Sequence, residues 1–224
     1  MEWNQDRFDQ FIIEHQVIGF FSESITLKSG RESHWYVNWR DIAEDVYLLD
    51  KLSDFVISYI QHKDFDPDCF FGVPEGATKL GILCQYKWAT SKADYQEGRY
   101  VLAMGRGKPK AHGELKDQNY LGIPRGKIVV IEDVTTTGGS MFSTVQNLLE
   151  FDINIIAAVG LTNRNEIRRD GKSVKELFDD IGIDYYAMSN AIDLLPKLNP
   201  QQSIAKKVQA YFEQYGTEGI DFHL

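Results

Sequence analysis

The chain has 224 residues, of which 43% are hydrophobic and 25% charged, enough to bury one sizeable core as an ordinary globular domain. Its formal net charge of -9 at pH 7 disfavours non-specific binding to nucleic acid, because an acidic surface repels the phosphate backbone. An anionic small molecule must therefore be met by a local group of donors or basic side chains.

The N-terminus and the cysteines bear on the cellular compartment. Residues 1–15, MEWNQDRFDQFIIEH, are acidic and amphipathic and lack the basic and apolar segments of a signal peptide. No apolar run is long enough for a membrane span. Cys69 and Cys84 have no metal-ligand spacing, and buried free thiols are favoured over a disulfide. We therefore expect a cytoplasmic protein.

The N-terminal third of the chain predicts a small β-rich part followed by a helix and a strand. Residues 19–38, GFFSESITLKSGRESHWYVN, predict short strands joined by a Ser-Gly turn, within a subdomain of about residues 1–45. Between Leu48 and Ile60 apolar residues recur at helical spacing, and CFFGV at 69–73 predicts a buried strand.

The alternation of helices and strands continues through a core of about residues 46–195. We expect helices at 76–86 and 141–149, and strands at 99–104, 127–132, 153–162 and 183–188. This order implies an α/β fold, with a parallel sheet covered by helices on both faces. A C-terminal helix within about residues 196–224 is expected to pack on the sheet, so that residues 1–224 form one domain.

The stretch KIVVIEDVTTTGGS, residues 127–140, runs an apolar strand into carboxylates, hydroxyls and glycines. In open α/β sheets, ligands bind beyond the carboxyl ends of the strands, where helix N-termini offer unpaired N–H groups. Residues 135–140 can therefore wrap a phosphate. Glu132 and Asp133 would repel that phosphate unless they bind the hydroxyls of a ribose between them. A ribose phosphate is the favoured ligand, since an ordinary helix N-cap explains only one or two of these residues.

The same stretch resembles the phosphoribosyl-pyrophosphate (PRPP) motif of type I phosphoribosyltransferases. Three further segments resemble the orotate phosphoribosyltransferase family, namely TLKSGRESHWYVN at 26–38, RGKPKAHGE at 106–114 and LTNR at 161–164. FGVPEGA at 71–77 also resembles the family's pyrophosphate-binding loop. The resemblance implies a type I phosphoribosyltransferase-like parallel sheet flanked by helices, with a small N-terminal hood. It also implies transfer of ribose 5-phosphate from PRPP to orotate, in pyrimidine (UMP) biosynthesis.

The resemblance assigns roles to individual residues. Lys110, His112 and Asp133 would be catalytic. The residues expected to bind PRPP are Lys28, Val73, Glu75, Gly76, Arg106, Lys108, Glu132, Thr135, Thr136, Thr137, Gly138, Gly139 and Ser140. The residues expected to bind orotate are Tyr36, Val37, Thr136 and Arg164, with the Arg164 guanidinium on the orotate carboxylate. Arg168 and Arg169 are expected to be solvated.

Residues 105–126 form a long polar segment without periodicity, which is typical of a functional loop. By resemblance it is a mobile catalytic loop whose cations close over the pyrophosphate leaving group. A solvated basic loop is the alternative. The corresponding loop of the bacterial enzymes commonly carries Arg-Lys before its second lysine. Here Gly107 follows Arg106 instead, and a lysine appears one place later, at Lys108. The role of the missing lysine either passes to Lys108 or is lost.

The resemblance implies Mg²⁺ as cofactor, held mainly by PRPP and not by dedicated protein ligands. It also implies a homodimer in which Lys110 and His112 act in the neighbouring active site. Neither nucleic acid nor a membrane is expected as a partner. Two alternatives stay open: an enzyme of the same fold that uses another base, and a regulator that senses PRPP without catalysis.

Overall fold

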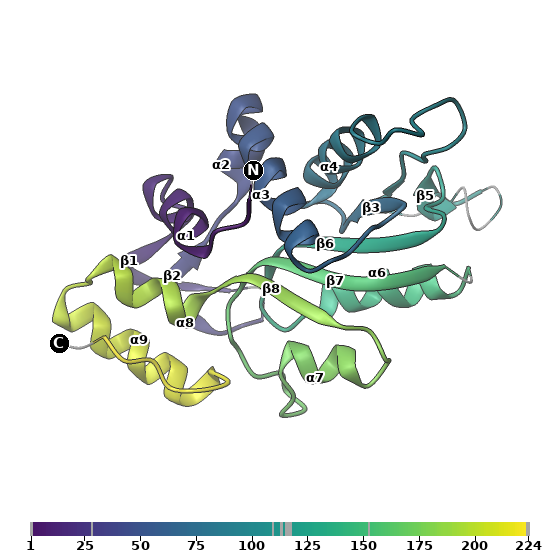
Figure 1. The fold of residues 1–224 in the computed structure, drawn as a ribbon. Helices are drawn as coiled ribbons and strands as arrows, with labels where there is room; N and C mark the ends of the chain where they lie inside the picture. Colours follow the sequence, from purple (N-terminus) through teal and green to yellow (C-terminus); the bar gives the residue numbers. More distant parts are fainter. Residues whose placement is uncertain are drawn as a thin grey trace.

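A four-stranded parallel sheet lies at the centre of the computed structural model (Figure 1). The structure describes residues 2–27, 29–108, 110–112, 114, 118–151 and 153–222. The strands are β3 (Cys69–Gly72), β6 (Lys127–Thr135), β7 (Asn154–Asn163) and β8 (Tyr185–Asn190), in the order β3-β6-β7-β8. The predicted α/β class with a parallel sheet is confirmed, and β6 runs past the predicted end at Glu132 to Thr135.

Alternate side chains of β6 enter two hydrophobic clusters on opposite faces of the sheet, as the period of a strand requires. Val129 and Ile131 face the cluster that holds α3 (Val46–His62) and α4 (Thr78–Thr90). Ile128 and Val130 face the cluster that holds α6 (Gly139–Leu149) and α7 (Val174–Asp179). All four side chains are 0% exposed, so β6 is fully buried below the strand ends.

An antiparallel hairpin of β1 (Ile18–Thr26) and β2 (Glu32–Val37) stands beside the sheet (Figure 1). The helices associated with it are α1 (Gln5–Glu14), α2 (Arg40–Glu44) and α9 (Gln202–Tyr215). The C-terminal helix α9 was expected on the parallel sheet, but its contacts are chiefly with β2. An aromatic contact holds α9 there, because Trp35 of β2 stacks on Phe212 of α9 with ring centroids 5.6 Å apart.

Two short helical elements complete the C-terminal part of the chain. The helix α8 (Ala191–Leu194) runs directly into a 3-10 turn, η1 (Leu195–Leu198), which leads to α9. Cys69 and Cys84 are buried free thiols, as predicted. Within the described part of the chain, no helix is both long and apolar enough to cross a membrane.

The predicted strand at 99–104 is wrong except at its last residue. The structure has only β4 (Met104–Gly105), paired antiparallel with β5 (Tyr120–Leu121). The preceding carbonyl of Val101 accepts a hydrogen bond from the Gln85 side chain at 2.8 Å, so a side chain takes the place of a ladder partner. Among the described residues between these two strands, the pairing continues from the Lys110 N–H to the Gln118 carbonyl at 3.0 Å.

Candidate active site

The site lies at the carboxyl ends of β6 and β7, where the chain turns from β6 into α6. Gly138 precedes α6 in the left-handed region, with φ 69°, which an L side chain rarely adopts. An ideal Cβ on Gly138 would also lie 3.0 Å from Val174. The turn therefore needs glycine in order to direct the unpaired N–H groups at the start of α6 into the space above the strand.

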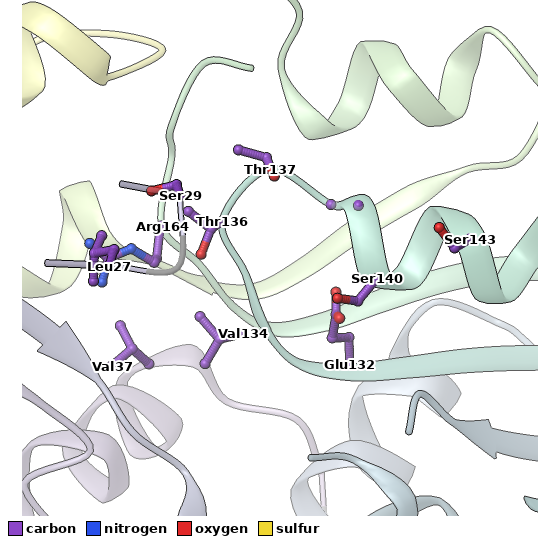
Figure 2. A pocket seen from close by; sticks show the side chains of 12 residues that line it. Leu27, Ser29, Val37, Glu132, Val134, Thr136, Thr137, Ser140, Ser143 and Arg164 are labelled. Atoms are coloured by element: carbon purple, nitrogen blue, oxygen red, sulfur yellow. The ribbon is translucent and has the colours of Figure 1, made fainter. Parts of the chain in front are cut away.

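A cavity of about 660 Å³ fills that space (Figure 2). It is lined by Leu27, Ser29, Val37, Glu132, Val134, Thr136, Thr137, Gly138, Gly139, Ser140, Ser143 and Arg164. Figure 2 shows Ser140 and Ser143 on one side of the cavity and Arg164 with Ser29 on the other. After the ligand groups expected there from the sequence, we call these sides the phosphate end, residues 136–140 with Ser143, and the base end, Leu27, Ser29, Val37 and Arg164.

A second hollow of about 1310 Å³ adjoins the first. The two share Val37, Glu132, Val134, Thr136 and Ser140 as lining residues. The larger hollow extends over the loop after β3, where it is lined by Val73, Pro74, Glu75 and Gly76. A phosphorylated sugar with a long leaving group could therefore extend from the cavity into this hollow.

The paired acids Glu132 and Asp133 lie where the two hollows meet. Glu132 is only 6% exposed, and burial, followed by the charge of Asp133, raises the pKa of its carboxyl to about 8. Burial also raises the pKa of Asp133, against the opposing effects of backbone hydrogen bonds and the positive charge of Arg40. Two poorly solvated carboxyls are suited to accept from sugar hydroxyls or to face a developing positive charge.

The loop after β3 approaches Asp133 closely because it carries glycine. An ideal Cβ on Gly76 would lie 2.5 Å from Asp133 Oδ2, so no larger residue fits without a shift. The Val73 N–H donates to the Ile131 carbonyl at 2.8 Å and so holds the start of the loop on β6. The peptide bond between Pro74 and Glu75 is cis. The basic side chains that line this hollow in the described structure are Arg40 and Lys79.

Arg164 is not a surface arginine, since its side chain is only 4% exposed. Its guanidinium donates through Nε to Glu166 Oε1 at 2.7 Å and through Nη2 to Ser33 Oγ at 3.3 Å. It also lies over the Trp35 ring, 3.6 Å from the centroid. The only cation of the first cavity among the described residues is thus held by β2 and by the segment after β7.

Several expected site residues lie elsewhere. The Thr135 side chain is fully buried and its hydroxyl bonds to the Tyr185 hydroxyl, so it supports the loop from below and lines neither hollow. Tyr36 packs on Phe21, with ring centroids 4.8 Å apart, and lines the larger hollow instead of the cavity that contains Arg164. Val37 lines both hollows.

The described residues of the basic segment after β4 do not line the cavity. Lys108, Lys110 and His112 are exposed, and neither they nor Arg106 lines either hollow. Gly107, however, lies against the loop after β3, because an ideal Cβ there would be 2.2 Å from Glu75 Oε1. The segment therefore starts beside the larger hollow. The predicted PRPP-binding residue Lys28 lies outside the described residues.

The residues outside the cavity that hold its lining residues in place were not identified from the sequence. Ser33, Trp35 and Glu166 contact Arg164, and Arg31 pairs with Glu166; their only signal was an acid two positions after Arg164. Arg168 was expected to be solvated, but its Nη1 donates to the Thr137 carbonyl at 2.7 Å and so fixes the phosphate end. Both supports join segments that are far apart in the sequence.

Among the described residues, no group of three or more His, Cys, Asp or Glu side chains is placed to hold a metal ion. A divalent cation here would therefore take part of its coordination from ligand oxygens. Glu132 and Asp133 could contact such an ion or its water molecules, since both carboxyls are short of solvent.

Known proteins with related sequences share one name. An orotate phosphoribosyltransferase of Bradyrhizobium sp. strain BTAi1 is 31% identical over 180 residues, covering 76% of this chain and 88% of the relative. The crystal structure of orotate phosphoribosyltransferase from Francisella tularensis has a TM-score of 0.69 at 24% identity, covering 94% of this chain and 99% of that one.

A third relative has the same fold and was solved with a ligand. The Mycobacterium tuberculosis orotate phosphoribosyltransferase in complex with PRPP has a TM-score of 0.57 at 16% identity, covering 85% of this chain and 98% of that one. No family model matches the chain. The 31% identity to the Bradyrhizobium enzyme, together with the type I phosphoribosyltransferase fold, shows that the chain belongs to the orotate phosphoribosyltransferase family.

Proposed function

We propose that the protein transfers ribose 5-phosphate from PRPP to orotate, forming orotidine 5′-monophosphate and pyrophosphate in pyrimidine biosynthesis. The observation that carries this proposal is the arrangement of the cavity, with helix N–H groups at one end, a buried arginine at the other, and Glu132 in its lining with Asp133 in the adjoining hollow. The three parts match the phosphate, carboxylate and ribose of the product.

The phosphate end would bind the 5-phosphate. Residues 136–139 and the start of α6 supply backbone N–H groups, and Thr136, Thr137 and Ser140 supply hydroxyls. The first turn of α6 carries no acidic residue that would oppose an anion. These features support a site that holds the phosphate largely through the main chain.

The paired acids would hold the ribose and assist the chemical step. A ring nitrogen of orotate forms a bond to the anomeric carbon, while the bond from that carbon to pyrophosphate breaks and its electron pair leaves with the pyrophosphate. The ring N–H proton is released. Positive charge develops on the ribose in between, and the carboxylate of Asp133, joined by that of Glu132 once it has lost its proton, would stabilise it.

The larger hollow would take the pyrophosphate. Val73, Glu75 and Gly76 line it, with Arg40 and Lys79 as its cations. Mg²⁺ bound by PRPP oxygens would neutralise part of the charge on the leaving group. We propose Arg106, Lys108, Lys110 and His112 as the groups that meet the pyrophosphate once the segment after β4 closes over it.

We also propose that the enzyme acts as a cytoplasmic homodimer and that Lys110 and His112 serve the neighbouring subunit. Their distance from both hollows in the single chain supports this idea. Mixing a Lys110→Ala chain with a Glu132→Ala, Asp133→Ala chain should restore part of the activity that each lacks alone. Failure to complement, in dimers shown to exchange subunits, would contradict action between subunits.

The reaction is tested by following the ultraviolet absorbance of orotate with purified protein, PRPP and Mg²⁺. We expect loss of orotate that depends on both additions, with orotidine 5′-monophosphate as product. Binding of PRPP without turnover of orotate would reject the proposal. A panel of other bases would then separate an enzyme for a different base from a non-catalytic PRPP sensor.

A further inference from the structure

A buried carboxylate, Glu166, lies between two arginines at the base end of the cavity. Its Oε1 accepts from Arg164 Nε at 2.7 Å, and its Oε2 accepts from Arg31 Nη1 at 2.5 Å. Glu166 is 0% exposed. The three residues come from the turn side of the β1–β2 hairpin and from the segment after β7, so the network joins separate parts of the chain.

Neighbouring groups fix both arginines further. Arg31 Nη2 donates to the Ile167 carbonyl at 2.6 Å, and its guanidinium lies 4.6 Å from the ring centroid of Tyr215. Arg164 lies over Trp35, whose other contacts include the stacked ring of Phe212. A network with this many partners leaves Arg164 little freedom to choose another rotamer.

The network leaves one side of Arg164 available for a ligand. Nε is used by Glu166 and Nη2 by Ser33, and the Tyr211 hydroxyl lies near both Arg164 and Glu166, while no hydrogen bond from Nη1 is found among the described residues. The Arg164 side chain lines the cavity, as does Ser29, whose buried hydroxyl also has no partner within the described structure. Two guanidiniums and one carboxylate leave one net positive charge, which a carboxylate on the ligand would balance.

We propose that Glu166 is a positioning residue that determines the selectivity of the enzyme for a base carrying a carboxylate, by holding Arg164 in the orientation that meets it. The inference rests on the proposed function. The proposed role differs from the effect expected of the Glu166 charge alone, since a negative group beside Arg164 would by itself weaken binding of an anionic base.

This opposition makes Glu166→Gln informative. If only charge mattered, removing the carboxylate would strengthen orotate binding, because the network would become more positive. If position matters, Arg164 loses its charged partner and orotate binding weakens. We expect the KM for orotate to rise about tenfold or more, as for loss of a hydrogen bond between charged groups. The calorimetric affinity for PRPP should stay within about twofold, because the phosphate end is separate.

Uracil serves as a probe, because it is orotate without the carboxylate. Glu166→Gln should leave the kcat/KM for uracil nearly unchanged, so that the preference for orotate over uracil falls about tenfold. A structural role alone would lower both values together. An unchanged or lower KM for orotate in a folded variant would overturn the proposal.

Two further variants serve as a second test and as a control. Arg31→Lys keeps the positive charge but loses the forked contacts to Glu166 and the Ile167 carbonyl, so it decides the question if Glu166→Gln does not fold. It should raise the KM for orotate, and an unchanged KM in folded Arg31→Lys would then overturn the proposal. Asp9→Asn is the matched control, because Asp9 is 4% exposed, pairs with Lys197 at 2.6 Å and lines neither hollow of the site. It should lower the thermal midpoint without changing the preference for orotate.

The wild-type protein separates the two possible failures. Absence of orotate turnover in the wild type would reject the proposed function itself. Normal turnover with an unaltered preference in Glu166→Gln would reject only the positioning role.

Discussion

The two ends of the cavity are built by different means. The phosphate end comes from one continuous stretch, residues 136–140, and relies on the main chain and the start of α6. The base end gathers side chains from β2, from the turn before it and from the segment after β7. On the proposed function, a common ligand group would thus bind to a local motif, whereas the group that distinguishes one base from another would bind to a network across the fold.

The largest effect that separates the two ends is expected from Arg164→Ala. Loss of a buried, positioned guanidinium should lower kcat/KM for orotate about 100- to 1000-fold, while the affinity for PRPP changes little. Steady-state kinetics with calorimetric titration of PRPP would measure both. An equal loss of PRPP affinity would show that the two ends do not act independently.

The second-largest effect is expected at Glu132, which lines both hollows. Its pKa rises from 4.5 to about 8 in the folded protein, so the folded state keeps a proton that the unfolded state releases. The stability due to this group is therefore complete below about pH 4.5 and is lost as the pH rises to about 8. Glu132→Gln removes this dependence.

We expect the difference in the free energy of unfolding between unliganded Glu132→Gln and the wild type to shift in favour of the variant by about 1–3 kcal/mol as the pH rises from 5 to 8. Urea titrations at several pH values would measure the difference. Glu97→Gln, at an exposed acid, is the control and should show no such trend. A constant difference across the pH range would contradict a buried, protonated Glu132.

The phosphate end is tested by Gly138→Ala. The left-handed backbone costs a side chain about 1–2 kcal/mol, and the methyl group would also meet Val174. The KM for PRPP should rise about tenfold. Gly182→Ala is the matched control, because Gly182 has φ 70° and no atom within 4 Å of an ideal Cβ. Equal effects on PRPP from both variants would mean that backbone strain alone, and not the loop, is responsible.

The smallest effect is expected at Gly107, the departure from the bacterial loop pattern. A methyl group there would meet Glu75, whose exposed side chain can swing away, so Gly107→Ala should change kcat less than about threefold. Gly105→Ala should cost more stability, because its methyl group would meet Pro74 and Phe71 in packed surroundings. A large loss of kcat in Gly107→Ala would indicate that the glycine is required for the segment to close.

The same contrast explains what could be predicted from the sequence. The parallel sheet and the loop from Glu132 to Ser140 follow from local patterns, since strand period, glycines and hydroxyls lie within one short stretch. Arg164 was also identified, through the resemblance of LTNR at 161–164 to the family's motif. Its partner Glu166 pairs in turn with Arg31, 135 positions away in the chain, and no local pattern joins these two residues.

Competing local interactions account for the other differences. The strand expected at 99–104 is absent up to Ala103 because the Gln85 side chain takes the Val101 carbonyl. Thr135 reads as one more hydroxyl of the phosphate motif, but strand alternation turns its side chain to Tyr185. In each case a partner distant in the sequence decides the outcome.

The most direct measurement compares the affinities of orotidine 5′-monophosphate and uridine 5′-monophosphate by calorimetry. The two ligands share phosphate and ribose and differ only in the carboxylate on the base. We predict that the wild type binds the orotidine compound at least about tenfold more tightly and that Arg164→Ala binds both alike. Equal affinities in the wild type would contradict a base end that recognises the carboxylate, and failure to bind either compound would contradict the phosphate end as well.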